Sequence, residues 1–147
     1  MKIILLAAAL AGGASASFAQ DGAPQPTEEF TPRAREAVQR GLAWLASRQS
    51  ENGSWHNKVG YKLYEGYYGE ENESVDVTAL ACMAMVSSGI VPGRGEYGRN
   101  VERGLQWLLS KVRDEDGYIT HAGSRMYSHA FATLFLAEIY GMTRQSE

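Results

Sequence analysis

The stretch RGLAWLASRQSENGSW, residues 40–55, carries the strongest structural signal in the chain, because a weaker copy, RGLQWLLSKVRDEDGYI, follows at residues 103–119. Each copy starts with a helical pattern and then reaches Asn-Gly or Asp-Gly, dipeptides that favour a turn. A unit that recurs in this way predicts a repeat architecture, in which neighbouring units cover each other's apolar surface.

Four helices are predicted around these two copies. The first should begin at Thr31, because a hydroxyl residue followed by Pro favours a helix start. The second, over 74–89, and the fourth, over 126–141, are apolar on nearly every side and should be buried. The third covers 100–112. The buried faces of the first and third are predicted to hold Ala34, Val38, Leu42 and Leu45, widened by Ala37, Gly41 and Trp44, and then Val101, Leu105, Leu108 and Val112.

No stretch alternates polar and apolar residues for long enough to predict a strand, so the expected fold class is all-α. Each amphipathic helix is followed by an apolar one, which predicts hairpins with the amphipathic helices outside and the apolar helices inside. Two hairpins leave apolar surface uncovered. We therefore expect contact with further repeats of the same kind, or self-association.

The first copy resembles the QW motif of the squalene cyclase and protein prenyltransferase superfamily, with Gln49, Gly53 and Trp55 at the motif positions. The resemblance implies that residues 31–143 are repeats of an α/α toroid, incomplete here because a closed toroid needs several more hairpins. The Gln amide can bond backbone groups left open at a helix end. Gly53 would supply the turn, and Trp55 would lie over the neighbouring hairpin.

The second copy departs from the motif. Val112 or Arg113 stands where Gln is expected, and Gly117-Tyr118 replaces Gly-x-Trp. We expect a weaker connection between units there.

Asp76 is the candidate catalytic residue. Class II terpene cyclases use an Asp-x-Asp-Asp-Thr-Ala segment, and residues 74–79 align with it so that Asp76 takes the place of the central, proton-donating Asp. The flanking carboxylates that would tune such an acid are missing, since Ser74 and Val77 occupy their positions. Asp76 also suits the first turn of a helix, where its charge favours the dipole.

A zinc site like that of the protein prenyltransferases is not expected, and no cofactor is predicted. Asp76, Cys82 and His129 are the right residue types. On a helix, however, Asp76 and Cys82 would point about 120° apart and lie about 9 Å apart along the axis. Zinc ligands must instead converge to about 2.0–2.3 Å from one ion.

Candidate binding residues lie in two places. His129 and Tyr127 enter the fourth helix where an inner helix of a toroid would open towards the central cavity, although His129 also suits a hydrogen bond near a helix start. Tyr64, Tyr67 and Tyr68 lie among glycines, before the carboxylates of residues 70–76. Aromatic faces beside carboxylates suit a glycan or peptide ligand, and tyrosines also pack long loops onto helices.

The first residues predict export. Lys2 precedes a short apolar run, and small residues follow up to Ala19, which fits a signal peptide over residues 1–19. The run is too short to span a bilayer, so no transmembrane span is expected. Pro-rich residues 20–30 read as a tether and residues 144–147 as a tail. The protein is expected to be periplasmic or extracellular.

Two functions stay open from the sequence. A net charge of −3 without a basic stripe excludes a nucleic-acid footprint. One hypothesis is a noncatalytic binding or scaffold module with an apolar or glycan ligand, since the acid cluster and a zinc set are missing. The other is part of a terpene cyclase-like or polysaccharide-processing enzyme whose other catalytic residues lie in further repeats.

Overall fold

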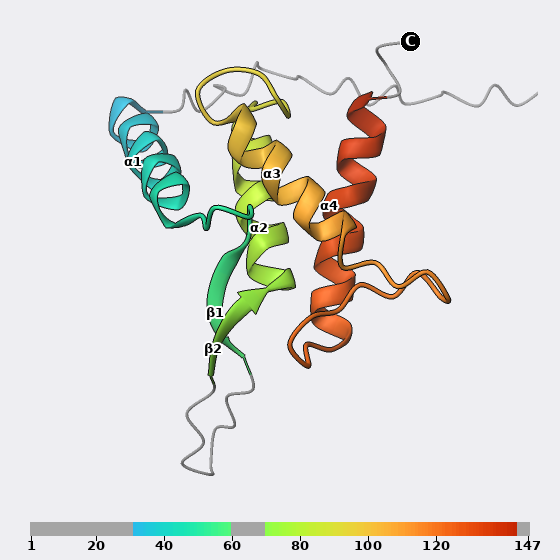
Figure 1. Ribbon diagram of the computed structural model, residues 1–147. Coiled ribbons are helices and arrows are strands. Elements are labelled where there is room, and N and C mark those ends of the chain that lie inside the picture. Colours follow the sequence, from blue (N-terminus) through green and yellow to red (C-terminus); the bar gives the residue numbers. More distant parts are fainter. Residues whose placement is uncertain (1–30, 60–69, 144–147) are drawn as a thin grey trace, which may run out of the picture. The chain divides into compact units, whose positions relative to one another are not determined.

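The computed structural model describes residues 31–59 and 70–143, and most of these residues are helical (Figure 1). In chain order the elements are α1 (Pro32–Arg48), β1 (Trp55–Val59), β2 (Glu70–Ser74), α2 (Val75–Ser87), α3 (Gly98–Leu109) and α4 (Met126–Thr143). The predicted signal peptide, tether and tail lie outside the described residues, as do Tyr64, Tyr67 and Tyr68.

The expectation of a mainly helical fold is confirmed, but the structure adds a small sheet that was not predicted, in which β1 and β2 pair antiparallel. Trp55 pairs with Ser74 at the buried base, and Val59 pairs with Glu70 at the far end. The strand sequences WHNKV and EENES are largely polar. Such a ribbon is held by its backbone hydrogen bonds and needs no buried face along its length, so alternating polarity did not reveal it.

The helix ends follow local chemistry with one exception. At the start of α1, the Thr31 hydroxyl accepts a hydrogen bond from the Ala34 N–H at 3.2 Å. Beyond α2, the chain turns at Gly89, whose φ of 86° lies in the left-handed region that favours glycine. The predicted end of the last helix at Gly141 is wrong, because α4 continues to Thr143. A glycine permits a helix to end but does not force it.

The core centres on α2, which packs most extensively against α4 and α3 and only slightly against α1 (Figure 1). An apolar helix that contacts two others over its length needs no polar face, which explains its composition. The apolar side chains of these helices with no exposed surface are Val75, Ala79, Cys82 and Met85 of α2, Val101 and Leu108 of α3, and Ala132 and Phe135 of α4.

The predicted buried face of α1 is only partly buried. Leu42 is 5% exposed, but Gly41 is open and Trp44 is 58% exposed. Their counterparts on α3, Gly104 and Trp107, are both buried. The difference arises because α3 packs along α2, whereas α1 lies at the edge of the described fold (Figure 1). The remaining predicted residues of this face are half-buried, namely Ala34, Val38 and Leu45, or exposed, namely Ala37.

Candidate functional site

The turn after α1 is attached to α3 by a single side chain. The Gln49 amide donates to the backbone oxygens of Gly53 at 3.0 Å and Asn100 at 2.8 Å. Its oxygen accepts from Asn100 Nδ2 at 2.8 Å and from Arg103 Nη2 at 2.7 Å. Both ends of the amide are therefore used, and Gln49 joins the first repeat to the second.

Two glycines let the turn and α2 approach α3 closely. A Cβ at Gly53 would lie 2.3 Å from the Arg103 carbonyl oxygen, and the φ of 95° there also favours glycine. A Cβ at Gly104 would lie 2.4 Å from Cys82 Sγ. Neither position 53 nor position 104 therefore has room for a side chain larger than that of glycine.

Trp55 fixes the end of the turn. It is 3% exposed, and its indole N–H donates to the Leu45 carbonyl at 2.8 Å. Its backbone N–H donates to Thr78 Oγ1, in the first turn of α2, at 2.9 Å. The tryptophan that follows α1 therefore packs back against the end of that helix and binds the start of the next.

In the second repeat the position of Trp55 is taken by Ile119, not by Tyr118 as the sequence comparison indicated. Ile119 is 3% exposed, and its N–H donates to His129 Nδ1, in the first turn of α4, at 3.2 Å. This bond matches that of Trp55 to Thr78. Arg113, a predicted substitute for Gln, instead pairs with Asp116 within its own turn.

The two candidate binding residues of α4 are not brought together. His129 is held by the Ile119 N–H and stacks on Tyr118, with ring centroids 4.7 Å apart. Tyr127 is 80% exposed. Two positions apart on a helix correspond to about 200°, so the two side chains leave α4 on different sides.

Asp76 lies in the first turn of α2 and is half-buried. Its Oδ1 accepts hydrogen bonds from the Ser74 hydroxyl and, at 3.1 Å, from the Val77 N–H. Both bonds are local, so Asp76 serves as a capping group at the start of α2.

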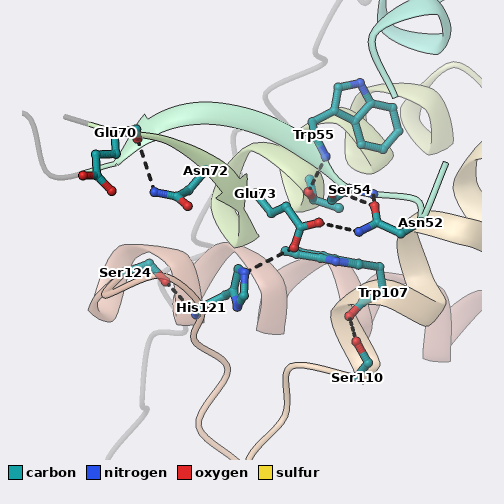
Figure 2. Close-up of polar contacts among 11 residues, drawn as sticks. Asn52, Ser54, Trp55, Glu70, Asn72, Glu73, Trp107, Ser110, His121 and Ser124 are labelled. Carbon is teal, nitrogen blue, oxygen red and sulfur yellow. Dashed lines mark hydrogen bonds and ion pairs between the residues drawn. The ribbon is translucent and has the colours of Figure 1, made fainter. Parts of the chain in front are cut away.

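A polar cluster that the sequence did not predict joins the strand pair to the second repeat (Figure 2). Glu73 of β2 accepts from the Asn52 amide and lies 3.2 Å from His121 Nε2. The rings of His121 and Trp107 make a T-shaped contact, with centroids 5.7 Å apart. On Trp107, Lys111 Nζ lies 4.9 Å from the ring centroid.

The electrostatics of this cluster favour the charged carboxylate. Burial opposes ionisation of Glu73, but the Asn52 hydrogen bond and the charges of Lys111, His121 and His56 outweigh it and lower the pKa below the ordinary 4.5. The Trp107 indole N–H is buried and has no hydrogen-bond partner among the described residues. A carboxylate that holds an imidazole is an arrangement suited to proton transfer.

No local signal in the sequence could have found the Glu73 and His121 pair. His121 has no metal-like or triad-like partner at short range in the sequence, and Glu73 is one of several carboxylates within residues 70–76. They meet only because β2 pairs with β1 and the loop before α4 folds back beside Trp107. Acid and base residues that come together through packing leave no spacing pattern.

Metal ligands do not converge in the described part of the chain, where no group of three His, Cys, Asp or Glu residues lies close enough to hold an ion. Burial raises the pKa of the Cys82 thiol to about 12. The thiol therefore stays protonated where it packs against Gly104. A thiol of this kind is an inert packing group.

A shallow cleft of about 360 Å³ separates α1 from the loop before α3. Its wall combines apolar side chains with a few charged and polar groups. The residues that line it include Gln39, Leu42, Ile90, Arg94, Glu96 and Tyr97. The volume falls in the range of small-molecule sites.

The fold and these contacts define a mainly helical protein built from two related helix-and-turn units. The squalene-hopene cyclase C-terminal domain family matches residues 27–143, and the chain belongs to this family. The match agrees with the resemblance to the squalene cyclase and protein prenyltransferase superfamily. No curated protein and no solved structure matches the chain. None of the helices in the described ranges has the length and apolarity to cross a bilayer.

Proposed function

We propose that the chain is an exported α/α-toroid repeat module that acts as a noncatalytic binding or scaffold domain. In this proposal α1 and α3 belong to an outer layer, α2 and α4 to an inner one, and further units of the same kind extend both layers. The signal-like residues 1–19 support export, and the family match supports the toroid class.

One observation carries the noncatalytic role. Asp76, at the position of the acid in class II cyclases, is bonded to the Ser74 hydroxyl and to the first turn of its own helix. Protonation of an alkene needs a carboxylic acid whose neighbours favour the protonated form. The hydrogen-bond partners of Asp76 are instead a serine hydroxyl and a backbone N–H, and Ser74 and Val77 stand where the flanking carboxylates of the cyclase segment would be.

A turnover assay with the full chain tests this role. Squalene dispersed in detergent is incubated with the wild type and with Asp76→Asn, and the organic extract is analysed for cyclised products by mass spectrometry. We expect no product from either protein. Product from the wild type that is lost in Asp76→Asn would refute the noncatalytic role.

A second candidate is part of a terpene cyclase-like or polysaccharide-processing enzyme whose other catalytic residues lie in further repeats. The cyclase family match and the pairing of Glu73 with His121 favour it. Release of reducing ends from a polysaccharide by the wild type, absent in Glu73→Gln, would support this alternative.

A further inference from the structure

α2 meets the second repeat at both α4 and α3, and its contact with α3 has two halves, of which the first is a face of α2. Cys82 on this face lies directly against Gly104 of α3. Spacings of three and four residues place the members of this face on one side of the helix. They are Val75, Ala79, Cys82 and Val86, and all four are buried.

The equivalent face of α4 is uncovered. Thr78 and His129 mark equivalent positions, because each accepts the backbone N–H of the residue that ends the preceding turn. This alignment places Thr133 at the position of Cys82. The four counterparts are Met126, Ala130, Thr133 and Ala137, and all are exposed.

The second half of the contact is a face of α3, and its counterpart on α1 is open as well. Gly104 admits Cys82, and Trp107 beside it is 5% exposed. At the same positions of α1, a Cβ added at Gly41 would have no described atom within 4 Å, and Trp44 is 58% exposed. The α2 face and the α3 face meet within the chain, whereas their counterparts on α4 and α1 are exposed in the described part of the chain.

Charge at the edges of the two open faces is complementary. The turn before α4 carries three consecutive exposed acids, and α1 carries exposed arginines. In the internal contact the corresponding turn meets α3 at Arg103, whose counterpart on α1 is Arg40. The acids are Asp114, Glu115 and Asp116, of which Asp116 is paired with Arg113, and the basic residues near the α1 face are Arg33 and Arg40, of which Arg40 is paired with Glu36.

We infer that α1 of one copy docks on α4 of a second copy, head to tail, through the same contact that joins α3 to α2 within each chain. Gly41 of one copy would receive Thr133 of the other, as Gly104 receives Cys82. Because the two faces differ, the contact is heterologous and adds copies in series or closes them into a ring. The inference deepens the proposed scaffold role and rests on it.

Sizing of the full chain by sedimentation velocity over a range of concentrations tests the inference. The wild type should exceed the monomer mass increasingly with concentration. Gly41→Leu and Thr133→Arg each block one face and should remain monomeric under the same conditions. At concentrations where both proteins are monomeric, Gly41→Leu should melt at or above the wild-type temperature, because it replaces an exposed helical glycine.

Mixing the two variants identifies the geometry. Gly41→Leu retains an intact α4 face and Thr133→Arg an intact α1 face, so an equimolar mixture should form a dimer and stop there. A symmetric contact between two α4 faces would instead leave Gly41→Leu associated by itself, and that result would overturn the inference. A wild type that stays monomeric at every concentration would also overturn it.

Failure of this inference is distinguishable from failure of the proposed function. Sedimentation reports only on association, and the squalene assay reports only on chemistry. A monomer without turnover would reject the docking and keep the noncatalytic role. An associated chain with turnover dependent on Asp76 would keep the docking and reject the noncatalytic role.

Discussion

Gly104→Ala should destabilise the protein, although the same change at the equivalent position of α1 should stabilise it. The new Cβ would lie 2.4 Å from Cys82 Sγ and 3.5 Å from both the Gly53 carbonyl oxygen and Trp55 Cζ3. Overpacking of a core costs about 1–3 kcal/mol. Alanine recovers about 1 kcal/mol of helix propensity. We therefore expect a net loss of up to about 2 kcal/mol in the free energy of unfolding.

Gly41→Ala is the matched control, because a Cβ there meets no described atom within 4 Å. It should stabilise the protein by about 0.5–1 kcal/mol. Urea titrations followed by circular dichroism, at concentrations where the chain is monomeric, give both values. Cys82→Ala combined with Gly104→Ala should recover part of the loss, and the double-mutant cycle measures the coupling. Stabilisation by Gly104→Ala equal to that by Gly41→Ala would refute the close packing of α2 on α3.

The remaining predictions concern the two turns, the polar cluster and metal content. Trp55→Ala should lower the free energy of unfolding by about 3–5 kcal/mol, because the side chain is buried. Trp44→Ala, at an exposed site, should lower it by less than about 1 kcal/mol in the same titrations. His129→Ala should cost about 1–3 kcal/mol by leaving the Ile119 N–H without an acceptor, and His129→Thr should cost less; equal losses would exclude this role. Glu73→Gln should lower stability at pH 7 by about 0.2–1 kcal/mol. Because folding lowers the pKa of Glu73, its stabilisation is present above the ordinary value of 4.5 and is lost as the pH falls through the lowered pKa. The urea midpoints of wild type and variant should therefore converge at acid pH, and a constant difference between them would contradict the assignment. The purified protein should contain no stoichiometric zinc, and a chelator should not shift its melting temperature; one zinc per chain by elemental analysis would show otherwise.

The helices were predictable because their signals are local. Thr31 before Pro, the apolar spacing of α3 and the continuous apolar run of α2 each depend on a few neighbouring residues. The strand pair was not predictable, since its polar sequences show no face that needs burial. The open face of α1 was also missed, because periodicity identifies an apolar face but not whether another element covers it.

The candidate site likewise contains some residues with a local sequence signal and others whose role depends on how separate elements pack. The roles of Gln49 and Gly53 follow from a motif in which residue type and spacing specify the geometry. The pairing of Glu73 with His121 depends on how separate elements pack, so neither residue carried a signal by itself. Asp76 was aligned by its motif, but only the structure shows that its carboxylate is bonded to Ser74 and to Val77 of its own helix start.

The two turns show why the second copy of the motif looked degraded although its attachment to the next helix is retained. A chain that leaves a turn beside a helix start must provide an acceptor for its own buried N–H. Thr78 supplies it to Trp55 with a hydroxyl, and His129 supplies it to Ile119 with a ring nitrogen. The physical requirement is one hydrogen bond, and two unrelated residue pairs meet it. The contact made by Gln49 differs in kind, because its partners, Asn100 and Arg103, belong to the next repeat. In the second repeat Arg113 is paired within its own turn, so any attachment of that repeat to a further unit must rest on the apolar face of α4 and the acids beside it.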